Sequence, residues 1–235
     1  MSAAAEAPYN EVLAAAQTAS WANVDETSWR ENKHKAWLWV MATALATVLM
    51  VQRHRSKEAA QKLMGADFEG VVITDRYSAY RWVDPERRQL CWAHLERDFQ
   101  AMVDRGGRSA GAGLRLQGAS DRMFKWWAGT RCGESATAGT CREILTLFVG
   151  LWTFVTVEGV EPTNNRAERD LRPAVQMRKL SFGTDSARGS RFFERIMTVV
   201  MTLRLHKRAL LDWLAEAYEA FRLRRAIPSL LAQPP

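Results

Sequence analysis

Three acidic residues, far apart in the sequence, stand in contexts that suit metal-ion chemistry. Asp25 lies in the strand-like run VDETSWR, Asp75 ends the apolar run GVVITD, and Glu168 lies in the arginine-rich segment NNRAERDLRP. Carboxylate oxygens are the ligands that Mg²⁺ and Mn²⁺ prefer in proteins. Three carboxylates brought together repel one another unless cations neutralise them. The sequence therefore suggests an acidic site that binds divalent ions.

Each of these acids also has a simpler structural explanation. Asp75 could be an ordinary turn residue that follows a strand. Asp25 could be a surface acid, and the neighbouring Glu26 is an alternative ligand. Glu168 follows Asn165 by three residues, which is the spacing of a capping box at the start of a helix. Taken one at a time, the three acids favour these structural roles.

The positive charge of the chain is concentrated in one segment that includes Glu168. Residues 164–208 hold eleven Lys or Arg against four Asp or Glu, so this segment carries the whole net charge of +7. Such a patch attracts a polyanion and makes its binding salt-dependent. A solvated helix face would have the same composition. We predict that five side chains contact DNA phosphates: Arg166, Arg169, Arg172, Arg178 and Lys179.

Cysteine and histidine residues offer a second kind of metal site. Cys91 and His94 have the spacing C-x-x-H, and Cys132 and Cys141 could complete a set of four zinc ligands. The nine-residue separation of the last two is not typical of a zinc knuckle. We therefore expect a buried Cys91 and a structural or DNA-proximal His94 in preference to zinc.

Composition indicates a folded intracellular protein. Hydrophobic residues make up 47% of the chain and charged residues 25%, which argues against disorder. Three irregularly spaced cysteines fit reduced thiols better than a disulfide framework. The N-terminus lacks a signal-peptide pattern, and the uncharged run 36–51 is shorter than the ~20 residues of a membrane span. We expect a cytoplasmic protein without a membrane segment.

Hydrophobic periodicity predicts a mixed α/β sheet flanked by helices. Ser56 is the expected N-cap of a helix that ends at Gly65. A helical insertion follows the sheet, and a helix over 165–172 then carries Glu168, with a polar loop and two amphipathic helices after it. The expected strands cover residues 24–30, 36–42, 45–52, 70–75 and 89–94. The other expected elements are a helix over 95–103, a loop over 104–118, and helices over 123–127 and 141–154.

Five segments of the chain resemble the insertion sequence 66 transposases, and they follow the order of that family. The segments are VDETSWRENKHKAWLWV, VVITDRYSAY, QLCWAHLERDF, EPTNNRAERDLRPAVQMRKLSFGT and GSRFFERIMTVV. The resemblance covers about residues 22–235. It implies a ribonuclease-H-like fold, an Asp-Asp-Glu metal site made of Asp25, Asp75 and Glu168, and cut-and-join chemistry on transposon ends and target DNA. Two Mg²⁺ or Mn²⁺ ions about 4 Å apart would serve such a site, and the active form would be a homo-oligomer.

The resemblance also sets the expected domain organisation. We expect a short N-terminal helical remnant (1–22), the first part of a catalytic domain (23–103), a helical and loop insertion (104–162), and a C-terminal part that completes the catalytic domain (163–235). Members of the family are usually longer, with a dimerisation region, a zinc-binding segment and a DNA-end-binding domain before the first aspartate. The alternative interpretation is therefore a truncated, non-catalytic remnant that still binds DNA.

Overall fold

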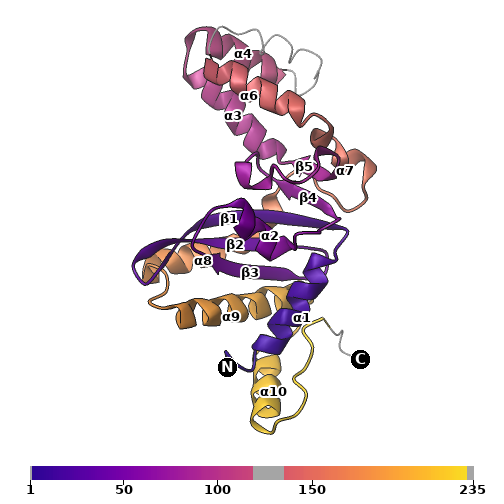
Figure 1. Cartoon of the computed structure of the whole chain (residues 1–235), viewed down its shortest axis with the longest axis vertical. Helices are drawn as coiled ribbons and strands as arrows, with labels where there is room; N and C mark the ends of the chain where they lie inside the picture. Colours follow the sequence, from indigo (N-terminus) through magenta and orange to yellow (C-terminus); the bar gives the residue numbers. More distant parts are fainter. Residues whose placement is uncertain (1, 119–134, 232–235) are drawn as a thin grey trace. The chain divides into compact units, whose positions relative to one another are not determined.

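The computed structural model of the chain describes residues 2–118 and 135–231. The chain divides into two compact units, which are described separately below. The first unit comprises residues 1–72, 77–82 and 164–235, and the second comprises residues 73–76 and 83–163. Five strands form one sheet in the order β3-β2-β1-β4-β5, and the division between the units falls within β4. Figure 1 labels the helices and strands.

Three antiparallel strands form the sheet of the first unit. They are β1 (Trp21–Glu31), β2 (His34–Ala42) and β3 (Thr47–Gln52). The register pairs Trp29 with Ala36 and Asp25 with Val40. Because successive side chains of a strand point to opposite faces, Asp25 and Trp29 lie on the same face of β1.

Helices α8 (Asn165–Ser181) and α9 (Ala187–Leu205) pack against this face of the sheet, as Figure 1 shows. The shared core joins apolar side chains of the three strands to those of the two helices. Trp29 stacks on Phe193 of α9 with ring centroids 4.6 Å apart, and Leu171 of α8 is buried in the same core. Burial of these side chains stabilises the unit by the hydrophobic effect.

Three further helices complete the first unit. Helix α1 (Glu6–Gln17) contacts β3 and α9, and α2 (Lys57–Met64) contacts β2. Ser56 caps α2 as predicted, because its hydroxyl accepts a hydrogen bond from Ala59 N at 3.4 Å. Helix α10 (Leu210–Arg222) follows α9 near the end of the chain.

The second unit is mainly helical. Strand β4 (Val71–Thr74) leads into it, and β5 (Arg88–Leu90) is followed by α3 (Trp92–Asp104), α4 (Gly107–Gly118), α6 (Ser135–Thr146) and α7 (Thr153–Thr156). Short 3-10 turns occupy Ser78–Tyr80 of the first unit and Pro85–Arg87 and Val149–Leu151 of the second. The core of this unit joins Phe99 of α3, Leu116 of α4 and Ile144 of α6.

The α/β class of the fold is confirmed, with a five-stranded sheet and flanking helices. Several local predictions are wrong. Residues 107–118 form helix α4 where a loop was expected, since Gly113 allows close packing on α3: a Cβ there would lie 2.7 Å from Phe99 O. The strand predicted over 89–94 ends at Leu90, and α3 already begins at Trp92.

Two other helix boundaries also differ from prediction. The helix expected over 141–154 is α6, which begins and ends earlier and is followed by a 3-10 turn and the short helix α7. The helix that carries Glu168 runs to Ser181 because packing of its apolar side chains on the sheet outweighs the helix-breaking effect of Pro173. The helix predicted over 123–127 lies outside the described residues. Within the described ranges, no helix is long and apolar enough to cross a membrane.

Candidate metal-ion and nucleic-acid site

Asp25 lies in the middle of β1, on the face that packs against α8. The side chain is half-buried, and its Oδ1 accepts a hydrogen bond from the backbone N–H of Glu26 at 2.9 Å. Thr27 and Trp29 follow on the same face by strand alternation. Asp25 therefore lies on the face of the sheet that α8 covers.

The neighbouring acid, Glu26, has a structural role. Its side chain points to the other face of β1, and the residue is 8% exposed. Arg55 reaches one carboxylate oxygen at 2.5–2.6 Å, and the Tyr80 hydroxyl donates to the other. The Arg55 guanidinium also lies over the Tyr77 ring, 3.6 Å from its centroid. Since this carboxylate is already neutralised and hydrogen-bonded, the geometry favours Asp25 over Glu26 as a metal ligand.

A buried pair of asparagines ties the start of α8 to β1. Asn164 Nδ2 donates to the carbonyl of Val24 at 2.8 Å, and Asn164 Oδ1 accepts from Asn23 Nδ2 at 3.0 Å. Both asparagines are fully buried. Val24 directly precedes Asp25, and the Glu168 N–H donates to the Asn164 carbonyl at 3.2 Å. The pair therefore holds the first turn of α8, which carries Glu168, against the part of β1 that carries Asp25.

The capping-box explanation of Glu168 is wrong. The N-cap of α8 is Asn164, whose side chain makes no capping hydrogen bond, and the first helical residue is Asn165. A capping box needs Glu or Gln at the third helical position, which is Ala167, and Glu168 stands at the fourth. Asn165 is exposed, so its accessory role stays a prediction. Sequence reasoning missed Asn164, although an Asn-Asn pair before a helix was a visible signal.

Asp75 belongs to the second unit, directly after β4. The side chain is half-buried, and the backbone carbonyl of Asp75 accepts hydrogen bonds from Thr74 Oγ1 at 2.9 Å and from Arg88 Nη2 at 3.0 Å. Arg88 is fully buried and also donates to Thr74 Oγ1 at 3.2 Å. The backbone at Asp75 is thus held in place by a buried guanidinium.

The three acids offer oxygen donors only, which suits hard divalent ions such as Mg²⁺ and Mn²⁺. Across residues 2–118 and 135–231, no three His, Cys, Asp or Glu side chains lie together as a group that could hold a metal ion. Asp25 and Glu168 lie in the first unit and Asp75 in the second. The oxygen donors of the three acids fit the expected ions, whereas the described residues do not show these acids grouped as one metal site.

The proposed zinc ligands are only partly described. Cys91 is buried at the N-cap of α3, and its backbone N–H donates to the Thr74 carbonyl at 2.8 Å. His94 is half-buried in the first turn of the same helix. Cys132 and the side chain of Cys141 lie outside the described residues, so the fourfold set stays untested.

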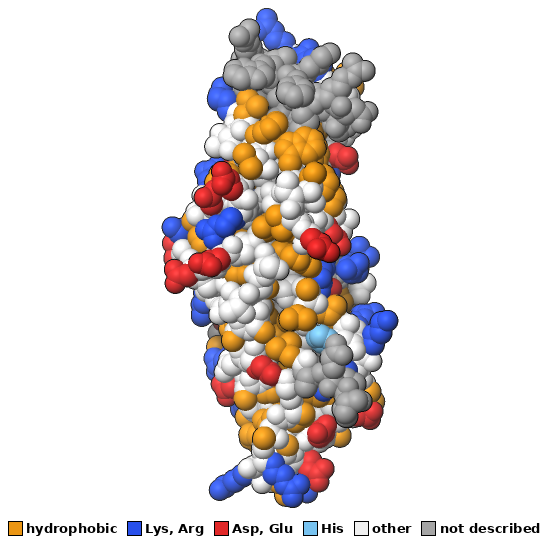
Figure 2. Space-filling model, turned by 90° about the vertical axis from the view of Figure 1, so that its right-hand side faces the viewer, with side chains coloured by type: hydrophobic (Ala, Val, Ile, Leu, Met, Phe, Trp, Pro, Cys, Tyr) orange, Lys and Arg blue, Asp and Glu red, His pale blue; other side chains and the backbone are white. Residues whose placement is uncertain are grey.

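The basic residues predicted to contact DNA differ in their surroundings. Arg166 lies over the Trp21 ring, 5.5 Å from its centroid, and Arg178 bonds to Thr27 Oγ1 at 3.2 Å. The other three residues, Arg169, Arg172 and Lys179, are exposed on α8. Within the described ranges these three form no ion pair, which leaves their charge available to a polyanion. On the face drawn in Figure 2, by contrast, Lys and Arg are interspersed with Asp and Glu.

Comparison with known proteins identifies the family. The sequence profile of the Transposase IS66 family matches residues 1–125 and 115–191. The chain belongs to this family. The description of this family is that of transposases, which points to a role in DNA transposition at the level of the family.

Comparisons with curated proteins and with solved structures do not identify a function. The chain is 28% identical to the uncharacterized protein y4qI of Sinorhizobium fredii, over 77% of this chain and 43% of that protein. It thus spans less than half the length of this relative. No solved structure matches the chain.

Proposed function

We propose that this chain is a catalytic core of an IS66 transposase, which cleaves phosphodiester bonds at transposon ends and joins them to target DNA. Asp25, Asp75 and Glu168 are the proposed metal ligands. The sheet with its flanking helices supports the expectation of a ribonuclease-H-like fold. The homo-oligomeric active form and the cytoplasmic location expected from the sequence belong to this proposal.

The observation that carries the proposal is the buried contact between Asn164 and Val24. It brings the first turn of α8 to the strand that bears Asp25, although 140 residues separate the two partners. Glu168 has no capping-box role there, and Glu26 is already occupied by Arg55 and Tyr80. The contact thus supports Asp25 and Glu168 as the two ligands that the first unit would contribute.

Each group has a defined part in the proposed chemistry. When bound, two divalent ions activate the attacking oxygen and stabilise the leaving oxygen. The three carboxylates hold these ions and offset their charge. The exposed cations of α8, Arg169, Arg172 and Lys179, position the DNA backbone and carry no sequence code.

Metal-dependent nicking of supercoiled plasmid DNA tests the proposal. We expect the wild type to nick in Mn²⁺, and Asp75→Asn and Glu168→Gln to lose at least 100-fold of that activity while retaining DNA binding. Asp170→Asn is the matched control, because Asp170 lies on α8 but accepts a hydrogen bond from Thr47 Oγ1 at 2.8 Å, which an amide oxygen can also accept.

Three results would decide between the proposals. Equal nicking by wild type and both site variants would exclude the metal site assigned to Asp75 and Glu168. A wild type that binds DNA but does not nick it with any divalent ion would support the non-catalytic remnant. Loss of nicking in Asp170→Asn as well would show that α8 tolerates no loss of charge, and would remove the evidence for a specific role of Glu168.

A further inference from the structure

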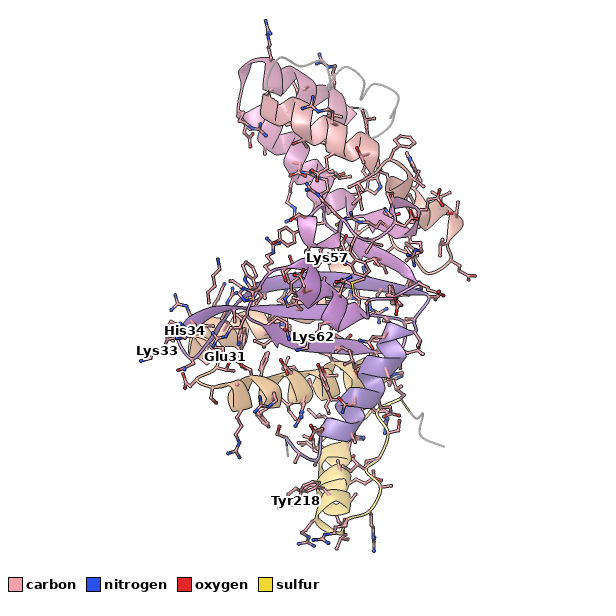
Figure 3. All side chains as sticks on the ribbon, viewed as in Figure 1. Glu31, Lys33, His34, Lys57, Lys62 and Tyr218 are labelled. Carbon is pink, nitrogen blue, oxygen red and sulfur yellow. The ribbon has the colours of Figure 1, made fainter. Side chains whose placement is uncertain are left out.

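A hollow of about 750 Å³ opens in the first unit at the β1–β2 hairpin and the C-terminal end of α8. Its lining includes four cationic side chains, Arg30, Lys33, Lys35 and Arg178, together with Phe182. Among the described residues that line it, none is acidic. We call this feature the basic hollow. Figure 3 shows Lys33 at the tip of the hairpin.

Among the described residues, no acidic side chain pairs with the cations of the basic hollow. Arg30 and Lys35 stand directly opposite each other in the β1–β2 register, and like charges in this position are destabilising. In the described part of the chain, neither Arg30 nor Lys33 forms an ion pair, and Lys35 Nζ lies over the Trp37 ring, 5.1 Å from its centroid. Glu31, the acid next to the hairpin turn, pairs with Arg53 at 3.7 Å and lines a different hollow. An anionic ligand would relieve this repulsion.

The walls of the hollow are held in place by the protein itself. The Thr184 N–H donates to the Arg30 carbonyl at 2.9 Å, and Trp29 Nε1 donates to Thr184 Oγ1 at 3.3 Å. Arg178 Nη1 donates to Ser28 Oγ at 2.6 Å. These contacts join the hairpin, the end of α8 and the segment that follows it. A ligand would therefore meet a preformed surface and would pay less ordering entropy on binding.

Two side chains of the hollow sit on unfavourable backbone. Lys33 has φ 62° in the two-residue turn of the hairpin, a position that favours Gly, Asn or Asp. Phe182 has φ 58° at the end of α8, where Gly is usual, and its side chain is 73% exposed. Left-handed backbone is unfavourable for residues that carry a Cβ. Strain of this kind concentrates at functional sites.

We propose that the basic hollow binds single-stranded DNA, with backbone phosphates on its cations and an unpaired base stacked on Phe182. Proteins that bind single strands combine a positively charged groove with exposed aromatic side chains in this way. Inorganic phosphate would satisfy the cations but would leave Phe182 unused. The inference deepens the proposed function and rests on its premise that DNA is the substrate, since cleaved DNA presents unpaired strands.

Fluorescence anisotropy with a labelled 12-nucleotide single strand, in EDTA, tests this inference. We expect the double variant Arg30→Gln with Lys33→Gln to bind at least tenfold more weakly, with a salt slope smaller by about 1.4. Phe182→Ala should weaken binding about 5- to 100-fold, and Phe182→Tyr should restore it. The charge-matched control is Arg222→Gln with Arg225→Gln, two exposed residues at and beyond the end of α10.

Each outcome bears on the proposal directly. A hollow variant that binds like the α10 control would overturn it, provided that thermal melting shows both to be folded. An abasic strand bound as tightly as the normal strand, or a strand displaced by millimolar phosphate with Phe182→Ala unaffected, would show a simple anion site and would also overturn it. The assay in EDTA measures binding without cleavage, so a wild type that fails to nick plasmid DNA would not change this result, and failure of the catalytic proposal remains distinguishable.

Discussion

Replacement of Asn164 by alanine is the sharpest test of how the structure positions Glu168. The change removes two hydrogen bonds between fully buried groups, one to the Val24 carbonyl at 2.8 Å and one from Asn23 Nδ2 at 3.0 Å. Each such bond contributes about 0.5–1.5 kcal/mol, and leaving its buried partner unsatisfied costs about 1–3 kcal/mol. The local structure can relax in part, so we expect the free energy of unfolding to fall by about 2–4 kcal/mol.

Urea unfolding followed by tryptophan fluorescence measures this loss, and plasmid nicking in Mn²⁺ measures its consequence. The neighbouring Asn165→Ala is the matched control, because Asn165 is exposed and is the first helical residue of α8, one position after the N-cap. We expect Asn165→Ala to change the stability by less than about 0.5 kcal/mol. If Asn164→Ala and Asn165→Ala have the same stability and the same nicking rate, the buried contact does not position Glu168 and the reasoning fails.

Three further variants test other parts of the structure. Burial raises the pKa of Glu194 from 4.5 to about 7. The carboxyl group therefore loses its proton at a lower pH in the unfolded chain than in the folded chain, and the free energy of unfolding falls as the pH rises from about 4.5 to 7, by about 3 kcal/mol at most. Glu194→Gln, whose amide oxygen can still accept a hydrogen bond from Val51 N, should remove this fall. If the wild type has the same free energy of unfolding in urea at pH 5 and at pH 8, the raised pKa of Glu194 is refuted. Gly183→Ala should lower the melting temperature by several degrees and weaken single-strand binding, because Gly183 has φ 109° and a Cβ there would collide with the Arg30 carbonyl. An unchanged melting temperature would contradict the close approach of Gly183 to Arg30. Arg88→Met should cost about 2–4 kcal/mol of stability in urea and weaken Mn²⁺ binding. Unaltered values would show that the hydrogen bonds from Arg88 Nη2 to Thr74 Oγ1 and the Asp75 carbonyl do not hold the Asp75 backbone.

Local sequence patterns were sufficient to predict the sheet of the first unit. Apolar, aromatic and β-branched residues mark β1, β2 and β3, and the structure places these strands at or within two to three residues of the expected bounds. Ser56 predicted the start of α2, and the short apolar run before Asp75 predicted β4. These signals were reliable because strand alternation and helix caps depend on residues that are close in the sequence.

Other features depend on contacts that no local pattern contains. Helix α8 passes through Pro173 because Leu171 and Ala174 pack on the sheet, and α4 forms because Gly113 lets it approach α3 closely. Tertiary contacts of this kind override helix propensity. The sequence placed the basic charge in residues 164–208, whereas the basic hollow combines Arg178 of that segment with cations of the β1–β2 hairpin.

The sequence by itself therefore determined the family resemblance, the three candidate acids and most of the strands, because these are carried by residue types and short spacings. Only the tertiary structure showed that Asn164 joins α8 to β1, that Arg55 and Tyr80 occupy Glu26, and that Phe182 lies beside the hairpin cations. The physical reason is the same in each case. A buried polar group or a desolvated charge must find a partner, and in a folded chain that partner can lie 140 residues away.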